Sequence, residues 1–392
     1  MSKYRIKTLN KIDIRGLALL HQNHDVNVDT NEDAILVRSA DMHTYQLSES
    51  LLAIARAGAG VNNIPVDKCS EKGIVVFNTP GANANAVKEL VIAGILLSAR
   101  NIVGGIEWAK TLDVDQDVCK MVESGKSNYT GPEVEGKTLG IVGLGAIGVL
   151  VANAASALGM QVIGYDPFIS VDAAWVLNRD VQKANSAEEI YSKADFISVH
   201  VPLMDATRHM VNKQSIAMMK DGVRILNFSR DALINDDDMQ EALESGKVAY
   251  YVTDFPNPKT VQMKNVIPIP HLGASTPESE VNCAIMASLE LKDYLENGNI
   301  KNSVNFPDCN AGPCSGAVRV TLHHRNVPGM VSKITSVLGE EKINIENMIN
   351  KSKKDWAYTV LDISDVLTEE NIKKLKGIDD VVRVRVIESC SI

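Results

Sequence analysis

The sequence predicts an α/β protein with two doubly wound parallel sheets, followed by a small antiparallel module. Three observations support this prediction. Short apolar segments alternate with helix-compatible ones through most of the chain, which is typical of parallel sheets. A glycine-rich loop directly follows one of the apolar segments. After a stretch rich in Gly, Pro and Asn, the remaining residues change to an alternation of apolar and polar side chains.

Length and composition limit the function classes. The 392 residues suffice for two or three domains, since a domain has roughly 100–200 residues. The balance of 40 basic and 49 acidic residues gives a net charge of −9 and argues against a nucleic-acid partner. The longest apolar run, Leu90 to Leu97, is too short for a membrane span, and the first residues lack the apolar stretch of a secretory signal. We therefore expect a cytoplasmic protein without a membrane partner.

The sequence of the N-terminal region predicts short strand–helix units. Apolar segments at 33–40, 51–63 and 73–81 have the composition of buried strands. Residues 87–100 form a helix pattern that is apolar nearly all round, which predicts a buried helix. A polar, weakly patterned connector follows and ends at 128–137.

The second parallel sheet is predicted from residue 138 onward. Residues 138–148 combine a strand with a glycine loop. Further apolar segments with intervening helices lie at 160–166, 194–202, 224–229, 248–255 and 265–270, and a long helix occupies roughly 276–297.

The last part of the chain predicts a ferredoxin-like module. A Gly-, Pro- and Asn-rich linker precedes it. The elements then follow in the order βαββαβ: a strand at 318–323, a helix that opens at Pro328-Gly329, strands at 343–350 and 356–364, a helix at 367–377 and a strand at 381–387. We expect this module to be separate from the main body.

The glycine loop has the spacing of a dinucleotide site. Gly143, Gly145 and Gly148 form GxGxxG between a strand and a helix, and Asp166 ends the next strand. The alternative is a glycine turn in another kind of α/β protein. Asp166 can accept hydrogen bonds from ribose hydroxyls and repel a 2′-phosphate, and residues 167–169 offer no cation. NAD is therefore favoured over NADP.

Two residues are candidates for hydride-transfer chemistry. Such a reaction needs a group that moves the hydroxyl proton and a cation that holds the carboxylate. Arg230 and His271 each follow a strand, where α/β sheets place ligands. A histidine in this place is also often structural, and His200 is interpreted so. The six cysteines lack zinc spacing, and no metal site is predicted.

The chain resembles the D-2-hydroxyacid dehydrogenase family. RAGAGVNN, NTPGANANAVKEL, GIVGLGAIG, HVPL, NFSRDALIN and PHLGAST occur in the family's order. The tail, with HHRNVPG, resembles an ACT domain of the serine-sensing type. Together they resemble the branch of the family that uses NAD to oxidise 3-phospho-D-glycerate to 3-phosphohydroxypyruvate, the first step of L-serine biosynthesis.

The resemblance implies a domain organisation. A Rossmann NAD-binding domain at 97–276 is inserted in a flavodoxin-like substrate domain made of 1–96 and 277–303. A linker at 304–315 leads to an allosteric, regulatory ACT domain at 316–392. The resemblance also implies a homo-oligomer, either a dimer or a tetramer.

The resemblance assigns roles to residues. It makes Arg230 the catalytic arginine and His271 the acid/base. The implied NAD contacts, together with the glycines of the loop, are Gly143, Gly145, Ala146, Ile147, Gly148, Asp166, Phe228, Ser229, Arg230, Asp254, His271, Leu272, Gly273 and Ala274. The implied substrate contacts are Arg38, Arg56, Gly58, Ala59 and Gly60, with Arg56 as a further cation for the phosphate. The implied contacts to an L-serine effector are His324, Asn326 and Asn344.

One departure from the family leaves alternatives open. Lys259 stands where the family usually has a glutamate that hydrogen-bonds the catalytic histidine. Either another acid such as Asp254 orients His271, or the pair is absent. Two alternative functions remain open. The chain is then either a hydroxypyruvate or glyoxylate reductase, or a non-catalytic NAD-sensing protein like the family's corepressors. For the tail, the alternative to serine sensing is that it only mediates contact between subunits.

Overall fold

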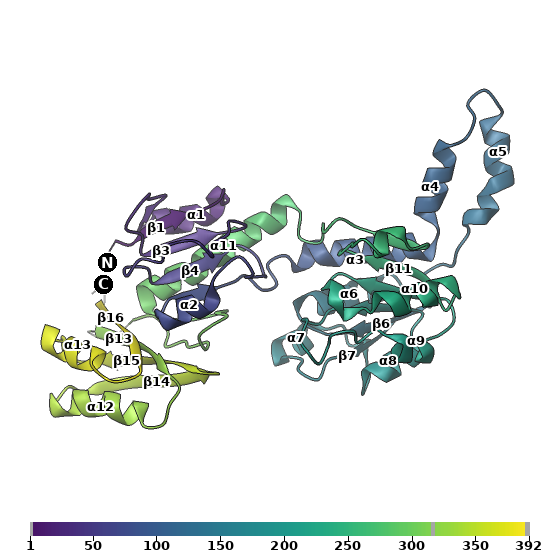
Figure 1. Cartoon of the computed structure of the whole chain (residues 1–392). Helices are drawn as coiled ribbons and strands as arrows, with labels where there is room; N and C mark the ends of the chain where they lie inside the picture. Colours follow the sequence, from purple (N-terminus) through teal and green to yellow (C-terminus); the bar gives the residue numbers. More distant parts are fainter. Residues whose placement is uncertain (1–2, 315–317, 389–392) are drawn as a thin grey trace. The chain divides into compact units, whose positions relative to one another are not determined.

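The computed structural model describes residues 3–314 and 318–388, which form two compact units. Unit 1 contains the chain up to Asn83 and from Pro277 onward, and unit 2 is Ala84–Thr276 (Figure 1). The sequence placed this boundary after residue 96. The difference is α3 (Ala84–Ala99), which packs against α6 (Ala146–Ala157) and two strands of unit 2.

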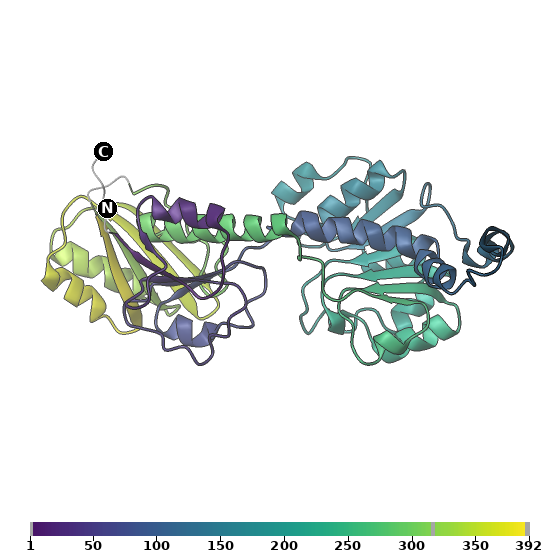
Figure 2. The ribbon, with the colours of Figure 1, turned by 90° about the horizontal axis from the view of Figure 1, so that it is seen from above.

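Unit 1 contains a parallel sheet of five strands in the order β2-β1-β3-β4-β5. This order is that of the predicted flavodoxin-like fold. Alternate residues of β3 belong to two different apolar clusters, so both faces of the sheet are covered. On one face α1 (Ile14–His21) and α11 (Pro277–Asn297) lie side by side (Figure 2). The strands are β1 (Arg5–Thr8), β2 (Asp25–Val26), β3 (Ala34–Val37), β4 (Ala53–Arg56) and β5 (Val75–Phe77), and α2 (Val66–Glu71) precedes β5.

Unit 2 contains a parallel sheet of seven strands in the order β12-β11-β10-β9-β6-β7-β8. The chain order reverses at β6, as in a Rossmann fold. The predicted strands are confirmed as β6 (Thr138–Val142), β7 (Gln161–Tyr165), β9 (Phe196–Val199), β10 (Val223–Asn227), β11 (Val248–Thr253) and β12 (Val266–Pro268). The short edge strand β8 (Gln182–Lys183) was not predicted. The smaller helices of this unit are α7 (Val171–Val176), α8 (Ala187–Lys193), α9 (Lys213–Met218) and α10 (Asp236–Glu244).

The polar connector is largely helical. It forms α4 (Ile102–Lys110), α5 (Val118–Gly125) and a short 3-10 helix (Lys126–Tyr129). No residue of α4 or α5 is buried, although Trp108 stacks on Tyr129 with ring centroids 5.1 Å apart. The connector thus contains two short helices that bury no residue, which were not predicted from the sequence.

In the described part of the chain, no single helix has the length and apolar character to cross a membrane. Taken as a pair bent by 68°, α3 and α4 satisfy the criteria of length and composition.

The C-terminal module confirms the predicted βαββαβ order. It contains β13 (Val318–Arg325), α12 (Met330–Glu340), β14 (Ile345–Lys353), β15 (Trp356–Ile363), α13 (Glu369–Lys376) and β16 (Val381–Glu388). Its sheet is antiparallel, in the order β14-β15-β13-β16. The predicted domain start at 316 lies outside the described residues.

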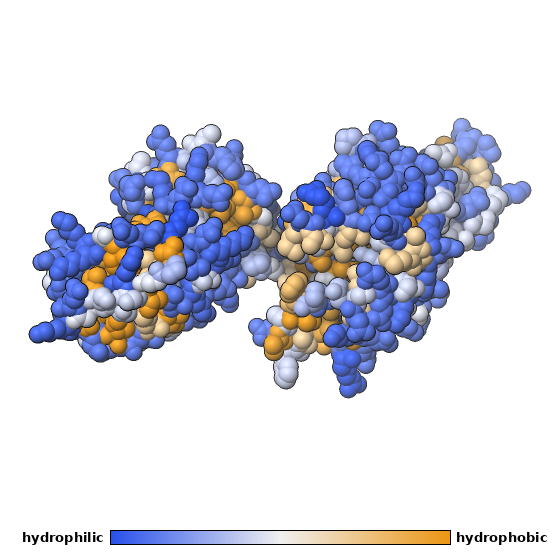
Figure 3. All heavy atoms as spheres, turned by 60° about the horizontal axis from the view of Figure 1, so that its bottom comes forward, coloured by the Kyte–Doolittle hydropathy of each residue, from blue (hydrophilic) through white to orange (hydrophobic). Residues whose placement is uncertain are grey.

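The module has its own sheet and its own apolar core, and it also contacts the rest of unit 1. Arg385 donates hydrogen bonds to the backbone oxygens of Tyr294 and Leu295, and Arg383 donates to that of Leu51 at 2.6 Å. The ring of His323 lies 4.9 Å from that of Phe306. These contacts explain why the module belongs to unit 1. Hydrophilic residues cover most of the surface of each unit in the view of Figure 3, and smaller apolar patches interrupt this surface on both units.

Candidate active site

The candidate residues of unit 2 lie at one edge of its sheet. Gly143 follows β6, Asp166 follows β7, Arg230 follows β10, Asp254 follows β11 and His271 follows β12. All these strands are parallel, so their carboxyl ends share the same edge. This edge is where open α/β sheets bind ligands.

The glycine loop has the shape that a dinucleotide requires. Gly143 has a φ of 97°, and a Cβ there would lie 2.4 Å from the backbone oxygen of His200. A Cβ on Gly148 would lie 2.0 Å from the oxygen of Gly143, so this glycine allows α6 to approach β6 closely. Gly145 has no other described atom within 4 Å of a Cβ position, and no described side chain caps α6. The first N–H groups of α6, which include those of Ala146 and Ile147, can therefore receive a pyrophosphate.

Asp166 is fixed beside this loop. Its carboxylate oxygens accept hydrogen bonds from the N–H groups of Leu144 at 2.9 Å and Phe168 at 2.8 Å. Lone pairs remain for ribose hydroxyls. Asp166 also lines a pocket of about 500 Å³, and so does Lys183. The sequence missed this lysine because only the pairing of Gly164 with Lys183 between β7 and β8 brings it there.

The turn that carries Arg230 is shaped by Asn227. The Oδ1 atom of Asn227 accepts from the N–H groups of Ser229 and Arg230, and its Nδ2 donates to the oxygen of Arg230 at 2.7 Å. Ser229 donates to the backbone oxygen of Val199 at 2.8 Å, and Phe228 is buried. The main chain at Arg230 is thus held firmly, while its side chain is exposed. Asn227 is a supporting residue that only the structure reveals.

The loop that carries His271 is held by Asp254. The two oxygens of Asp254 accept from the N–H groups of Leu272 at 2.7 Å and Gly273 at 2.9 Å. A Cβ on Gly273 would lie 2.8 Å from Oδ2 of Asp254, which explains the glycine. The ring of His271 is exposed and lies 4.9 Å from that of Phe255. Ala274 continues the same loop and is half-buried.

Lys259, which stands at the position of the family's glutamate, forms an ion pair with Asp237 of α10. The distance between Nζ of Lys259 and Oδ1 of Asp237 is 2.6 Å. In the described ranges no hydrogen bond joins the ring of His271 to a carboxylate. Burial raises the pKa of Asp254, and its bonds to Gly273 and Leu272 oppose this rise. Asp254 therefore contacts the backbone of the loop that carries His271, not the imidazole ring. His200 is half-buried, its Nε2 contacts the hydroxyl of Ser198 at 2.8 Å, and desolvation of the ring lowers its pKa to about 4, which agrees with a structural role.

In unit 1, Arg38 follows β3 at the carboxyl edge of the five-stranded sheet. Its Nη2 lies 2.6 Å from Oε1 of Glu280, and both side chains are largely exposed. The side chain of Asn10 accepts from the N–H groups of Arg38, Ser39 and Ala40, each at 3.0 Å. Asn10 thus fixes the turn after β3, a role that the sequence did not indicate.

Arg56 ends the neighbouring strand β4 and lies against the loop Gly58-Ala59-Gly60. A Cβ on Gly58 would lie 2.3 Å from Nη1 of Arg56, so a glycine is needed for this approach. Asn78 donates to the backbone oxygen of Ala59 and holds the loop. The structure therefore places Arg38, Arg56 and the loop on adjacent strands.

The three residues implied for L-serine do not meet within one chain. His324 is buried, and its ring nitrogens contact the oxygen of Arg325 and the hydroxyl of Thr359. Asn326 donates to the oxygen of Lys354. Asn344 precedes β14 at the opposite end of the sheet, about 20 Å away at roughly 3.3 Å per residue.

The comparison with known families gives one match over the site. The model of "D-isomer specific 2-hydroxyacid dehydrogenase, NAD binding domain" matches residues 92–273. This range contains the glycine loop, Asp166, Arg230 and His271. NAD is therefore the cofactor of this domain, and the loop geometry described above fits it.

Curated relatives match more of the chain. A D-3-phosphoglycerate dehydrogenase of Methanocaldococcus jannaschii is 37% identical over 285 residues, which cover 70% of this chain and 52% of that protein. A second one, of Haemophilus influenzae, is 31% identical over 365 residues, or 90% of this chain and 85% of that protein. A hydroxypyruvate reductase of Thermotoga maritima is 36% identical over 305 residues, or 71% of this chain and 94% of that protein. The chain thus spans about half the length of the first relative and most of the other two.

Solved structures agree with the fold. The NAD⁺-bound 3-phosphoglycerate dehydrogenase of Entamoeba histolytica is 25% identical, with a TM-score of 0.58, and the match covers 78% of this chain and 99% of that one. The two-unit α/β architecture, the glycine loop and these matches lead to one conclusion. The chain belongs to the D-2-hydroxyacid dehydrogenase family.

Proposed function

We propose that the chain oxidises 3-phospho-D-glycerate to 3-phosphohydroxypyruvate with NAD, which would be the first step of L-serine biosynthesis. One observation carries this proposal: Arg230 and His271 follow strands that end at the same sheet edge as the glycine loop and Asp166. An arginine and a histidine beside a dinucleotide loop supply the cation and the base that oxidation of a 2-hydroxy acid needs.

In the proposed reaction, Arg230 binds the substrate carboxylate through its planar guanidinium and polarises the C2 oxygen. His271 takes the proton of the C2 hydroxyl. Bound NAD supplies the acceptor for the hydride from C2. Asp254 keeps the His271 loop in place, and Asn227 does the same for the turn of Arg230.

Arg38 and Arg56 would bind the phosphate of the substrate. Arg38 follows β3 and Arg56 ends the adjacent strand β4, next to the glycine-containing loop, whose backbone N–H groups can also donate. The pair of Arg38 with Glu280 is exposed, and exposed pairs contribute only about 0–1 kcal/mol. A phosphate can therefore replace Glu280 as the partner of Arg38 at little cost.

A substrate series tests this proposal. We expect kcat/KM for 3-phospho-D-glycerate to exceed that for D-glycerate by at least about ten-fold, or about 1.4 kcal/mol, because only the former has a phosphate for the two arginines. Initial rates of NADH formation give the comparison. A higher kcat/KM for D-glycerate or glycolate would favour the reductase alternative, which the Thermotoga maritima relative represents.

The geometry around Asp166 predicts cofactor preference. Its carboxylate is held at the loop and would repel a 2′-phosphate, so we expect NADH to bind at least about ten-fold more tightly than NADPH. Fluorescence titrations with both cofactors measure this ratio. The variant Asp166→Ala should narrow it, whereas Asp172→Ala on nearby α7 should not. Equal affinities of the unchanged protein for NADH and NADPH would show that Lys183 offsets the repulsion between Asp166 and the 2′-phosphate.

The C-terminal module would bind L-serine between two chains of a homodimer or homotetramer, since Asn326 and Asn344 lie at opposite ends of one module. We expect L-serine to inhibit, and Asn344→Ala to raise the concentration for half inhibition at least about ten-fold with little change in the uninhibited kcat. Inhibition curves measure both quantities. If L-serine neither inhibits nor gives heat of binding, the module serves assembly.

A further inference from the structure

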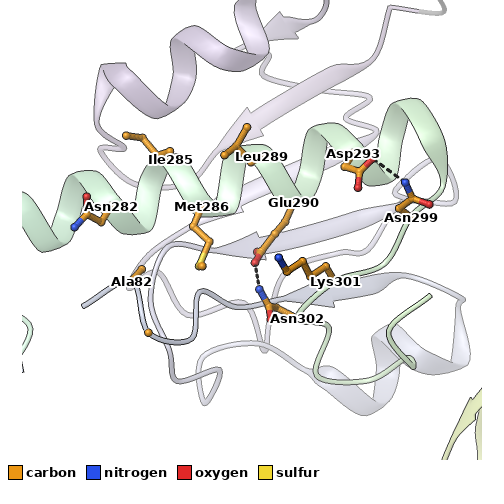
Figure 4. A pocket seen from close by; sticks show the side chains of 11 residues that line it. Ala82, Asn282, Ile285, Met286, Leu289, Glu290, Asp293, Asn299, Lys301 and Asn302 are labelled. Carbon is orange, nitrogen blue, oxygen red and sulfur yellow. Dashed lines mark hydrogen bonds between the residues drawn. The ribbon is translucent and has the colours of Figure 1, made fainter. Parts of the chain in front are cut away.

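Unit 1 contains a pocket that none of the residues assigned to the reaction lines. It lies along α11, and its volume is about 580 Å³. Met286 and Glu290 point from α11 toward the segment that contains Lys301 and Asn302, and Ala82 lies nearby (Figure 4). The pocket thus combines an apolar part with a polar one.

Glu290 is the unusual residue of this pocket. Its side chain is buried, with 7% of the residue exposed. Oε1 accepts a hydrogen bond from Nδ2 of Asn302 at 2.6 Å, whereas Oε2 is buried and has no hydrogen-bond partner among the described residues. A buried carboxyl oxygen without a donor is costly, and native proteins rarely leave one so. The pocket therefore lacks a hydrogen-bond donor at Oε2.

The surroundings of Glu290 indicate which donor fits. Asp293, one turn further along α11, already accepts from the amides of Asn297 and Asn299. Lys301 is exposed at the polar part of the pocket. Burial raises the pKa of Glu290 to about 8; the charge of Lys301 opposes this rise and that of Asp308 adds to it. A cation beside Oε2 would lower this pKa, because it favours the charged carboxylate.

The apolar part of the pocket is lined by aliphatic side chains of α11. Ile285, Met286 and Leu289 line it from α11, and half of the surface of Leu289 is exposed. An exposed aliphatic wall next to a buried acid is complementary to a molecule that has a cationic head and an aliphatic body.

We propose that this pocket binds a small aliphatic molecule with a primary ammonium group, which donates to Oε2 of Glu290 while its hydrocarbon part packs on Met286 and Leu289. An ammonium has three donors and no acceptor, so it matches an unpaired carboxylate oxygen. The charged pair is favourable because Asn302 already satisfies the other oxygen. Such a ligand is distinct from the substrate proposed above, which is anionic.

Calorimetry on the full chain tests the proposal. The probes are n-butylamine and L-norvaline, and 1-butanol and butyrate are the controls without an ammonium or with the opposite charge. We expect one site per chain for the two ammonium probes and no binding of the controls. Because Glu290 must lose its proton to pair with the ammonium, about one proton should be released at pH 7 and almost none at pH 9. Titrations in buffers with different ionisation enthalpies measure this number.

Two variants of α11 identify the residue. Glu290→Gln keeps the shape and removes the charge, so it should abolish binding of both ammonium probes. Glu278→Gln, an exposed glutamate of the same helix, should bind as the unchanged protein does. Equal binding of 1-butanol, or retained binding of n-butylamine by Glu290→Gln, would overturn the proposal. These measurements need no turnover, so they fail or succeed independently of the dehydrogenase reaction.

The melting temperature checks that the variant folds. Since the folded-state pKa of Glu290 is raised, its carboxyl costs stability progressively as the pH rises from the unfolded value toward about 8. Glu290→Gln should therefore melt at a higher temperature than the unchanged protein at pH 8, and this difference should shrink at pH 5. A lower melting temperature of the variant at both pH values would show that Oε2 is already satisfied, which also overturns the proposal.

Discussion

The variant His271→Ala is expected to lower kcat by about 10²–10⁴, the usual contribution of a general base. The loop that carries His271 is held by Asp254 through the backbone of Leu272 and Gly273, and these bonds do not involve the ring. Removal of the imidazole should therefore leave the loop and the glycine site intact. NADH binding, measured by fluorescence, should remain within a few-fold of its original value.

The matched control is His21→Ala. His21 is an exposed histidine in the last turn of α1, far along the chain from any proposed catalytic group. This variant should keep the activity of the unchanged protein. An active His271→Ala protein would contradict the assignment of His271 as the base. A His271→Ala protein that is inactive and also fails to bind NADH would show that the residue supports the loop instead.

The variant Arg230→Lys is expected to lower kcat/KM by about 10²–10³, although it keeps the positive charge. The guanidinium can bind a carboxylate with two parallel hydrogen bonds, and an ammonium cannot reproduce this geometry. The main chain at Arg230 is fixed by Asn227, so a shorter or differently shaped head group cannot be repositioned easily. Removal of one hydrogen-bond donor from a developing oxyanion lowers kcat by a factor of the same order, about 10²–10³.

The same substitution at Arg15 is the control for Arg230→Lys. Arg15 is exposed and pairs with Asp13 at the start of α1, a surface pair of about 0–1 kcal/mol. Arg15→Lys should therefore change neither kcat/KM nor the melting temperature appreciably. If Arg230→Lys retained most of the activity, a simple positive charge would suffice, and the proposed two-point binding of the carboxylate would be wrong.

The sequence predicted the parts of the fold that have strong periodic or glycine signals. The strands of the NAD-binding sheet are buried on both faces, so each appears in the sequence as a run of apolar residues. The loop 143–148 has the glycine spacing that is typical of dinucleotide-binding folds. The βαββαβ module was predicted from the alternation of its strands, the Pro-Gly start of one helix and the pattern of the other. These features depend on local residue order, so a single sequence is enough to recognise them.

The parts that were missed depend on contacts between distant residues. Helices α4 and α5 are short and lack the buried apolar residues that mark α3. Lys183 reaches the pocket of Asp166 only through strand pairing, and Asn10 reaches the turn of Arg38 only through the fold. The two compact units divide after Asn83, whereas the predicted boundary follows residue 96, because the composition of α3 shows that it is buried but not against which unit.

The contacts between the C-terminal module and the rest of unit 1 were not predicted for the same reason. Arg319, Arg383 and Arg385 are charged residues on strands, which the alternation rule assigns to an exposed face. In the structure Arg319 and Arg385 are buried, and all three donate to backbone oxygens of preceding parts of unit 1. Sequence alone could not supply these acceptors.

The measurement that tests the central claim most directly is NADH formation by the purified full chain with NAD and 3-phospho-D-glycerate. The account predicts a rise in NADH absorbance, matched mole for mole by 3-phosphohydroxypyruvate in mass spectrometry of the product. Tight binding of NAD without any NADH formation, with 3-phospho-D-glycerate or any other D-2-hydroxy acid, would contradict it and indicate a non-catalytic NAD-sensing protein.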